Sequence, residues 1–349
     1  IVSGAIQNLH LEVSDQAGSE WNNWLTKLDG NIYHSTQWAE TRRTATSRPL
    51  FLRWHDNSDS TRGIAVGIES RSSFPVIGRH FRHLELGTFP AAGSSRDCLI
   101  QSLIDQLLDY SRKAGHSSLE VQSYYADSRC LRSEHLGFEV AHRLEFVIDL
   151  TLPEEQLWRN LHNNHRRKIG KARKHDLKFE HASDLEAMRE FRKLQVQSRD
   201  RRQNRGEHIG TVDDSYYERF GRAYFERNLG RVYLLRHQGA AISGAFVSMY
   251  AGKAYYVFGG SSDEGFKMDA PALLFWEIFS HCRELGCHEF NMGGVPAVAI
   301  DKGAQSHGLY RFKAGFGGRQ VPCTSLTAEN LQPRRDWLIK RAKKVFRGR

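Results

Sequence analysis

The sequence predicts an α/β (α+β) fold in two tandem domains, each with a mixed sheet flanked by helices. First, a chain of 349 residues with 40% hydrophobic content is longer than the roughly 250 residues at which single cores stop growing. Second, amphipathic segments alternate with β-rich segments. Third, the order helix, glycine, strand, Gly-Phe, strand occurs twice. We expect a first domain over 1–150, a second over 151–325 and a basic tail over 326–349.

The first copy of this order begins with an amphipathic segment over 97–115. Its apolar residues stand at positions 99, 100, 103, 104, 107 and 108, the spacing of a helix with one buried face, and Gly115 ends it. The β-rich stretch "SSLEVQS" follows, and Gly137-Phe138 leads into a β-rich run that ends near Leu150. We therefore expect a helix followed by two strands in this half.

The second copy repeats the order over 270–321. "APALLFWEIFSHCRELG" has the features of a helix that ends at Gly286, "HEFNMGG" those of a strand, and Gly315-Phe316 precedes the last strand. Before this copy, three β-rich segments over 231–262 are interrupted at "HQG" and "YAGK", which predicts a meander of antiparallel hairpins.

Several classes of protein are disfavoured. No run of about 18 apolar residues occurs, and the first residues lack a signal-peptide pattern, so we expect a cytoplasmic protein. The five cysteines are scattered and odd in number, which does not indicate a disulfide framework. "HCRELGCH" holds two His and two Cys, but the cysteine spacing matches no common zinc site, so we expect no metal.

The positive charge is confined to the second half of the chain. Residues 1–150 carry 15 Lys and Arg against 18 Asp and Glu, whereas residues 151–349 carry 35 against 22. An excess of this size attracts polyanions, such as tRNA, a nucleotide-linked substrate or an anionic membrane surface. A basic face that serves only solubility is the alternative.

Part of this charge lies in "EEQLWRNLHNNHRRKIGKARKHDLKFE", which joins the two halves. Its apolar residues keep near one helical stripe, while Arg167, Lys171 and Lys174 form an i, i+4, i+7 row on another face. Arg166 stands beside this row. We expect these four residues to bind tRNA phosphates, and a solvated helix face is the alternative.

The motifs together resemble the Fem family of aminoacyl-tRNA-dependent peptidyltransferases. The resemblance rests on "YHSTQWAE", "LWRNLHNNHRRKIGKARKHDLKFE", "YYVFGGSS", "APALLFWEIFSHCRELGCHEFNMGG" and "GLYRFKAGFGG", and runs from Tyr33 to Val321. It implies two halves of the GNAT-like fold. It also implies transfer of an aminoacyl group from aminoacyl-tRNA to an amine of a peptide, a cell-wall precursor or a small-molecule acceptor. The long coiled-coil arm of some cell-wall members is missing, because no heptad pattern persists over 181–230.

The resemblance also implies a site around Phe312-Lys313, which matches the Phe-Lys pair of the family's C-terminal motif. Lys313 would stabilise the negative oxygen of the tetrahedral intermediate. Gly315, Gly317 and Gly318 would let backbone approach the acceptor end of the donor. Without the resemblance, Lys313 would be a surface charge on a strand.

Other site residues follow by position in the family. We expect the acceptor to contact an aromatic residue near the start and Arg and Tyr residues in the second half: Trp38, Arg199 or Arg202, Tyr217 and Tyr256. A packing role for the aromatics, and a solvated role for the arginines, is the alternative in each case. No spacing singles out a general base among Asp269, Glu277, Asp301 and His307.

Two other functions remain open. An acyl-CoA-dependent GNAT-type N-acyltransferase is the first, although "GGSSDEGFKMDAPALLFWE" lacks the glycine-rich loop that binds coenzyme A pyrophosphate. A non-enzymatic nucleic-acid or membrane-surface protein is the second, because eight Lys and Arg lie among 334–349. We expect a monomer without a cofactor, and a peripheral contact of the tail with an anionic inner membrane.

Overall fold

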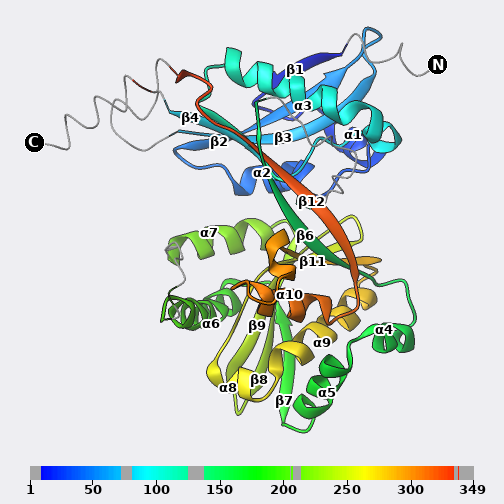
Figure 1. Ribbon diagram of the computed structural model, residues 1–349, viewed down its shortest axis with the longest axis vertical. Coiled ribbons are helices and arrows are strands. Elements are labelled where there is room, and N and C mark those ends of the chain that lie inside the picture. Colours follow the sequence, from blue (N-terminus) through cyan, green and yellow to red (C-terminus); the bar gives the residue numbers. More distant parts are fainter. Residues whose placement is uncertain are drawn as a thin grey trace, which may run out of the picture. The chain divides into compact units, whose positions relative to one another are not determined.

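The computed structural model describes residues 9–71, 81–124, 137–204, 206, 214–333 and 337. The chain forms two compact units (Figure 1). Unit 1 comprises Ile1–Arg143 and Pro322–Arg349, and unit 2 comprises Leu144–Val321. The chain therefore enters unit 2 within strand β6 (Glu139–Asp149) and leaves it within strand β12 (Arg319–Ala328).

Unit 1 has a mixed sheet in the order β1-β2-β3-β4-β5-β12. Its strands are β1 (His10–Ser14), β2 (Ser47–His55), β3 (Thr61–Arg71), β4 (Arg82–Leu86), β5 (Ser118–Val121) and the end of β12. Its helices are α1 (Trp21–Lys27), α2 (Thr36–Thr41) and α3 (Arg96–Lys113), with 3-10 helices η1 (Ile32–His34) and η3 (Gly93–Ser95). Each of the strands β1 to β4 pairs antiparallel with the next one in the sequence. Strand β4 pairs parallel with β5, and β12 pairs antiparallel with β5.

Helix α3 covers one face of this sheet because its apolar stripe lies on one side (Figure 1). The six apolar positions predicted from the sequence are all buried, at 7% exposure or less: Leu99, Ile100, Leu103, Ile104, Leu107 and Leu108. The helix ends where expected, since Gly115 takes the left-handed conformation at φ 79°.

Unit 2 has the strand order β6-β11-β10-β9-β8-β7. Besides β6, its strands are β7 (Leu177–Ala182), β8 (Gly230–His237), β9 (Ala240–Tyr250), β10 (Lys253–Ser261) and β11 (Glu289–Pro296). Its helices are α4 (Glu154–Asn160), α5 (Asn163–Ala172), α6 (Leu185–Asn204), α7 (Asp214–Phe225), α8 (Asp263–Lys267), α9 (Ala270–Glu284), α10 (His307–Ala314) and 3-10 helix η4 (Ala297–Ile300).

The predicted meander is confirmed, because β8, β9 and β10 pair antiparallel through tight turns. Each turn has two residues with positive φ, Gln238-Gly239 and Ala251-Gly252, as two-residue hairpins require. Helix α9 then leads back to β11, which pairs parallel with β10. Its buried residues, among them Leu274, Phe275 and Ile278, form much of the core of unit 2.

The one helical stripe expected over the basic segment does not run along a continuous helix. The structure has two helices, α4 and α5, separated by Leu161 and His162 in extended conformation. The break has a partner elsewhere in the unit, because the backbone N–H of His162 donates to the carbonyl of Gly315 at 2.9 Å. A continuous helix would direct that N–H into its own hydrogen-bond ladder.

The repeat predicted from the sequence is present in the fold. In unit 1 a strand, helix α3, a parallel strand and Gly137-Phe138 precede β6; in unit 2 a strand, helix α9, a parallel strand and Gly315-Phe316 precede β12. No coiled-coil arm occurs among the described residues, where 181–230 contains helices α6 and α7, of 20 and 12 residues, between strands β7 and β8.

Candidate active site

Lys313 lies on α10 and is buried, with 5% of the residue exposed. The structure thus excludes a surface charge on a strand. Its ammonium donates to the carbonyl of Gly294 at 3.1 Å and stands 5.6 Å from the ring centroid of Tyr256. Burying an ammonium is costly unless its surroundings are polar or electron-rich, and this carbonyl and ring supply both kinds of contact.

The two strands beside Lys313 stop pairing at this place. Parallel pairing of β10 with β11 covers three residue pairs and ends at Tyr255 and Asn291. Beyond that point β10 has a bulge between Tyr256 and Phe258. Gly293 has φ 69°, and a Cβ there would lie 3.4 Å from Nζ of Lys313. The ammonium therefore sits where two parallel strands separate, next to backbone that carries no side chain.

Phe312 packs inward from the same helix. Its ring is partly buried and lies 5.7 Å from that of Phe275 and 5.2 Å from that of Phe316. These aromatic contacts hold α10 against α9 and thereby fix the helix that carries Lys313. Phe312 thus positions the lysine through packing.

The glycines of "GLYRFKAGFGG" approach the chain's own backbone and side chains. A Cβ on Gly315 would overlap the ring of His165, one on Gly317 the Asn160 carbonyl, and one on Gly318 would lie 2.7 Å from the Val147 carbonyl. Their immediate role is therefore to let α4, α5 and β6 pack closely on the turn after α10.

A buried carboxylate near β11 was missed by the sequence reasoning. Glu145 on β6 is 1% exposed, and its Oε2 accepts a hydrogen bond from Nδ2 of Asn291 at 2.8 Å. Asn291 in turn accepts from the N–H of Gly293 at 2.7 Å. These two hydrogen bonds order the glycine turn at Gly293 and Gly294. The carbonyl of Gly294 in this turn accepts the hydrogen bond from Lys313. No local motif marks Glu145, because it comes from a strand 146 residues away from Asn291.

His165 on α5 is a second residue that the sequence did not single out. It is 3% exposed, its ring lies 4.5 Å from that of Phe316, and neither ring nitrogen has a hydrogen bond of normal geometry to the described residues. Burial lowers the pKa of His165 to about 4, against the opposing effect of the Phe312 backbone. The ring is therefore neutral at physiological pH and packs as an aromatic residue.

Three of the expected acceptor residues interact with this part of unit 2. Burial raises the pKa of Tyr256 to about 12, opposed by the positive charge of Arg202 on α6. The Tyr256 hydroxyl is thus protonated at neutral pH and able to donate a hydrogen bond. Tyr217 on α7 is buried, and its hydroxyl donates to Gln195, which in turn bonds the Gly259 carbonyl on β10.

Arg199 and Trp38 are placed differently. The Arg199 side chain is 24% exposed and pairs with Asp200 at 3.6 Å. Trp38 lies in unit 1, is 6% exposed and makes an edge contact with Tyr33 at 5.0 Å between ring centroids. Its indole belongs to the packing of α2, and its acceptor role stays a prediction.

The basic row is not wholly helical: Arg166, Arg167 and Lys171 lie on α5, whereas Lys174 follows the helix, which ends at Ala172. Arg167, Lys171 and Lys174 are exposed, and Arg166 is half-buried. The row is partly neutralised, because Lys171 pairs with Asp269 at 3.2 Å. The inner side of α5, with Ile169 and Ala172, packs in the core of unit 2.

The four candidate bases have distinct surroundings. Asp269 pairs with Lys168 and Lys171, at 3.6 and 3.2 Å. Burial raises the pKa of Glu277, although Arg173 lies 3.7 Å away. Nδ1 of His307 is 3.0 Å from the Ala299 carbonyl, and Asp301 is exposed. None of these contacts assigns a base.

Metal ligation and membrane insertion find no support in the described part of the chain. It contains no group of three or more His, Cys, Asp or Glu side chains arranged to hold a metal ion. None of its helices combines the length and apolar character needed to cross a bilayer. Of the basic tail expected over 326–349, residues 326–328 form the end of β12, and the residues from 334 on, which carry its Lys and Arg, lie outside the described part of the chain apart from the exposed Trp337.

Comparison with known proteins agrees with this fold. Residues 159–314 match the family model described as an acetyltransferase (GNAT) domain. The crystal structure of FemX aligns with a TM-score of 0.72 at 15% identity, covering 94% of this chain and 100% of FemX. No curated protein sequence matches significantly.

Two further solved structures share the fold over most of the chain. A tandem GNAT protein from the clavulanic acid biosynthesis pathway, without AcCoA, aligns with a TM-score of 0.54 at 12% identity, over 92% of this chain and 99% of that one. The structure of L-PGS from Bacillus licheniformis aligns with a TM-score of 0.53 at 12% identity, over 94% and 97%. The chain thus has two tandem domains with the GNAT-like fold, and its resemblance to the Fem family is confirmed at the level of the fold.

Proposed function

We propose that this protein is a Fem-like N-acyltransferase that transfers an aminoacyl group from aminoacyl-tRNA to an amine acceptor. The acceptor amine belongs to a peptide, a cell-wall precursor or a small molecule. The observation that carries the proposal is the ammonium of Lys313, 5% exposed and held by the Gly294 carbonyl where β10 and β11 stop pairing. A fixed, buried cation is suited to stabilising a charge that develops during reaction.

In the proposed reaction the acceptor nitrogen attacks the ester carbonyl carbon of the aminoacyl-tRNA. The carbonyl oxygen becomes an oxyanion next to Nζ of Lys313. The ester C–O bond then breaks as the amide forms, and the terminal ribose hydroxyl of the tRNA leaves with the proton that the amine loses. The protonated hydroxyl of Tyr256, whose ring faces the ammonium, is a second donor for the oxyanion or the acceptor.

The exposed cations on α5 and just after its end would contact the tRNA phosphates. Arg167 and Lys174 are the best candidates, since both are exposed. Lys171 is a weaker candidate because Asp269 neutralises part of its charge.

An acyl-CoA donor is the second candidate, favoured by the match of residues 159–314 to an acetyltransferase (GNAT) domain. The surroundings of the α9 N-terminus argue against it. Asp269 is the N-cap residue there, and Asp263 and Glu264 open the preceding helix. Carboxylates at this end compete with a pyrophosphate for the helix N-terminus.

The test is a donor comparison on the full chain. Pools of aminoacyl-tRNA and of acyl-CoA are offered separately with a panel of amines, and acceptor-dependent release of free tRNA or CoA is measured. We expect tRNA release, greatly reduced by Lys313→Met and unchanged by Lys302→Met, which removes an exposed lysine from the same region. Release of CoA alone would identify acyl-CoA as the donor. Release of neither tRNA nor CoA would favour a non-enzymatic binding function.

A further inference from the structure

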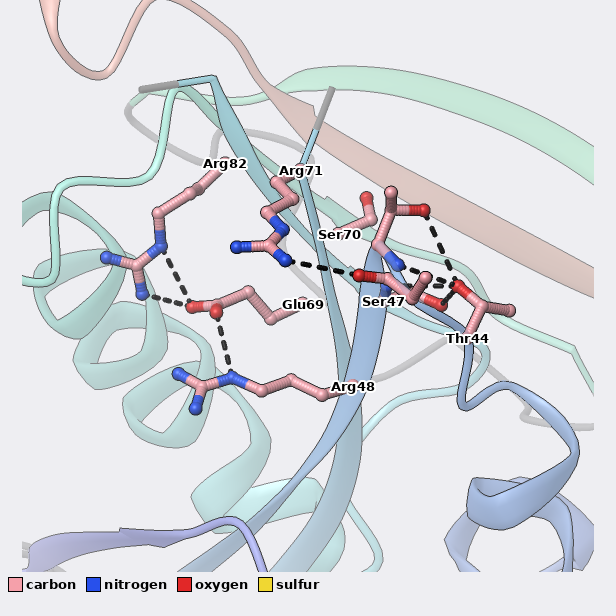
Figure 2. A pocket seen from close by; sticks show the side chains of 9 residues that line it. Thr44, Ser47, Arg48, Glu69, Ser70, Arg71 and Arg82 are labelled. Carbon is pink, nitrogen blue, oxygen red and sulfur yellow. Dashed lines mark hydrogen bonds and ion pairs between the residues drawn. The ribbon is translucent and has the colours of Figure 1, made fainter. Parts of the chain in front are cut away.

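Unit 1 contains a pocket that the proposed transfer does not use. It has a volume of about 480 Å³ and is formed by the turn before β2, the end of β3 and the start of β4. Its lining residues are Thr44, Ala45, Thr46, Ser47, Arg48, Glu69, Ser70, Arg71 and Arg82 (Figure 2).

Strand register explains why the charged residues gather there. Arg48 is opposite Glu69 across β2 and β3, and Arg71 is opposite Arg82 across β3 and β4. Because Glu69 and Arg71 are two residues apart on one strand, all four side chains leave the same face of the sheet. Figure 2 shows the three guanidinium groups on the side of the Glu69 carboxylate, with Thr44, Ser47 and Ser70 on the other side.

Glu69 is a fixed internal anion of this pocket. Its side chain is 10% exposed, and its oxygens accept hydrogen bonds from Arg48 at 3.0 Å and from Arg82. His116, fully buried, lies 3.0 Å from the same carboxylate through Nε2. Burial alone would raise the pKa of Glu69, but the bonds from His116 and Arg82 and the charges of Arg82 and Arg48 lower it to about 2.

One ionised carboxylate leaves the pocket with an excess of two positive charges. Arg71 makes no ion pair within the described residues; its side chain donates to the Ala45 carbonyl at 3.2 Å. Arg48 uses only Nε in its bond to Glu69, and its side chain is 49% exposed. Two like charges directly opposite on paired strands, as in Arg71 and Arg82, repel unless an anion stands between them.

The hydroxyl side of the pocket is already ordered. Oγ1 of Thr44 accepts from the backbone N–H groups of Thr46 and Ser47, at 3.2 and 3.1 Å, which fixes the turn without a ligand. The hydroxyl of Ser70 has no hydrogen bond to the described residues. Because Ser70 lies between Glu69 and Arg71 on β3, its side chain leaves the opposite face of the sheet, so the donors that face a ligand beside Glu69 are guanidinium groups.

We propose that this pocket binds a phosphate monoester group through the guanidinium groups of Arg48 and Arg71. A phosphate monoester carries close to two negative charges at pH 7 and offers three acceptor oxygens, which matches the excess charge and the free donors. Arginine forks bind such oxygens in pairs. The volume exceeds that of a phosphate alone, so the group is carried by a larger molecule, either a soluble metabolite or a lipid headgroup.

The first experiment is isothermal titration of the full chain with inorganic phosphate and with glycerol 3-phosphate at low ionic strength. We expect saturable binding at one site per chain. Arg71→Gln removes charge-assisted hydrogen bonds and should weaken binding at least about tenfold. Arg62→Gln is the matched control, because Arg62 lies on the same strand but pairs with Asp56 outside the pocket; it should change affinity less than about twofold.

Two further experiments test whether the phosphate group belongs to a lipid or to a soluble molecule, and whether the pocket prefers phosphate to a carboxylate. Cosedimentation with phosphatidylcholine vesicles that contain phosphatidic acid, lost in Arg71→Gln, assigns a lipid headgroup; binding of glycerol 3-phosphate without cosedimentation assigns a soluble molecule. Equal affinity for acetate, or equal binding by Arg71→Gln and Arg62→Gln, overturns the phosphate site. Thermal unfolding of each variant shows that it is folded.

Discussion

Units 1 and 2 share a plan but hold their charges in different ways. Each has a parallel strand pair joined by a long helix, β4-α3-β5 and β10-α9-β11, and each continues through Gly-Phe into a long strand. Unit 1 surrounds Glu69 with Arg48, Arg82 and His116. Unit 2 instead buries the Lys313 ammonium against a carbonyl and an aromatic ring.

The difference shows which part of the plan can vary. The core helix of each unit must pack tightly on its sheet, and both α3 and α9 bury apolar residues there. The segment between the parallel strand and Gly-Phe is under no such constraint. In unit 2 it forms η4 and α10 and supplies Lys313; in unit 1 the corresponding residues, 125–136, lie outside the described part of the chain.

The largest expected effect is on turnover, which should depend on the charge of Lys313 in unit 2 and not on a surface arginine of unit 1. Lys313→Met retains a side chain of similar length without the charge, and turnover of an identified substrate should fall about 10²-fold or more. Lys313→Arg should restore only part of the rate, because a planar guanidinium does not fit where a compact ammonium did. Arg62→Gln in unit 1, outside the pocket, should leave turnover within about twofold. Wild-type turnover by a folded Met variant would remove Lys313 from the chemistry.

A second prediction concerns the close packing after α10. Gly317 has φ 75°, and a Cβ there would overlap the Asn160 carbonyl. Gly317→Ala should therefore lower the free energy of unfolding of unit 2 by about 1–3 kcal/mol or more. Gly308→Ala, in the same helix region with no atom within 4 Å of its Cβ, should instead be neutral or stabilising by up to about 1 kcal/mol. Urea unfolding of both variants measures the contrast, and equal midpoints would contradict it.

The third prediction uses pH to distinguish the units, beginning with unit 2. The pKa of His165 is lowered from 6.5 to about 4 by burial, so the unfolded chain takes up a proton first as pH falls. Stability of unit 2 should drop between about pH 6.5 and 4, by up to about 1.4 kcal/mol per pH unit. His165→Leu should flatten this dependence. Hydrogen exchange of unit 2 peptides measures it, and an unchanged slope in the variant would assign the effect to other groups.

In unit 1, the stability that depends on ionised Glu69 is lost over a lower pH range than the stability that depends on His165 in unit 2. Its pKa falls from 4.5 to about 2 in the folded protein, so the carboxylate stabilises the fold above pH 4.5. That stability is lost as pH falls toward 2. Exchange in unit 1 peptides should therefore rise at lower pH than in unit 2 peptides. Simultaneous onset in both units would show that they unfold as one.

The smallest expected effect concerns the exposed charges on α5 and just after its end. Neutralising Arg167 and Lys174 together, as Arg167→Gln and Lys174→Gln, should reduce the magnitude of the log-log salt slope of tRNA binding by about 0.7–0.9 for each lost phosphate contact. Arg62→Gln and Lys27→Gln together remove two charges from unit 1 and should leave the slope unchanged. Equal slopes in all three proteins would make α5 a solvated face.

The sequence by itself determined the architecture. The apolar spacing over 99–108 predicted the buried face of α3, and the turns "HQG" and "YAGK" predicted the hairpins of unit 2. These features depend on local periodicity and backbone conformation, which neighbouring residues set. The order of motifs also indicated the GNAT-like fold and directed attention to Lys313.

Only the tertiary structure decided what surrounds those residues. It divided the basic segment into α4 and α5, because the N–H of His162 bonds the carbonyl of Gly315. It buried Lys313, whose ammonium donates to the Gly294 carbonyl, and it placed Glu145 within hydrogen-bond distance of Asn291, 146 residues away in the sequence. It also placed Arg48, Arg71 and Arg82 around Glu69 through strand register. Such contacts depend on which strands pair and where pairing ends, and no local pattern in the chain encodes that distance in space.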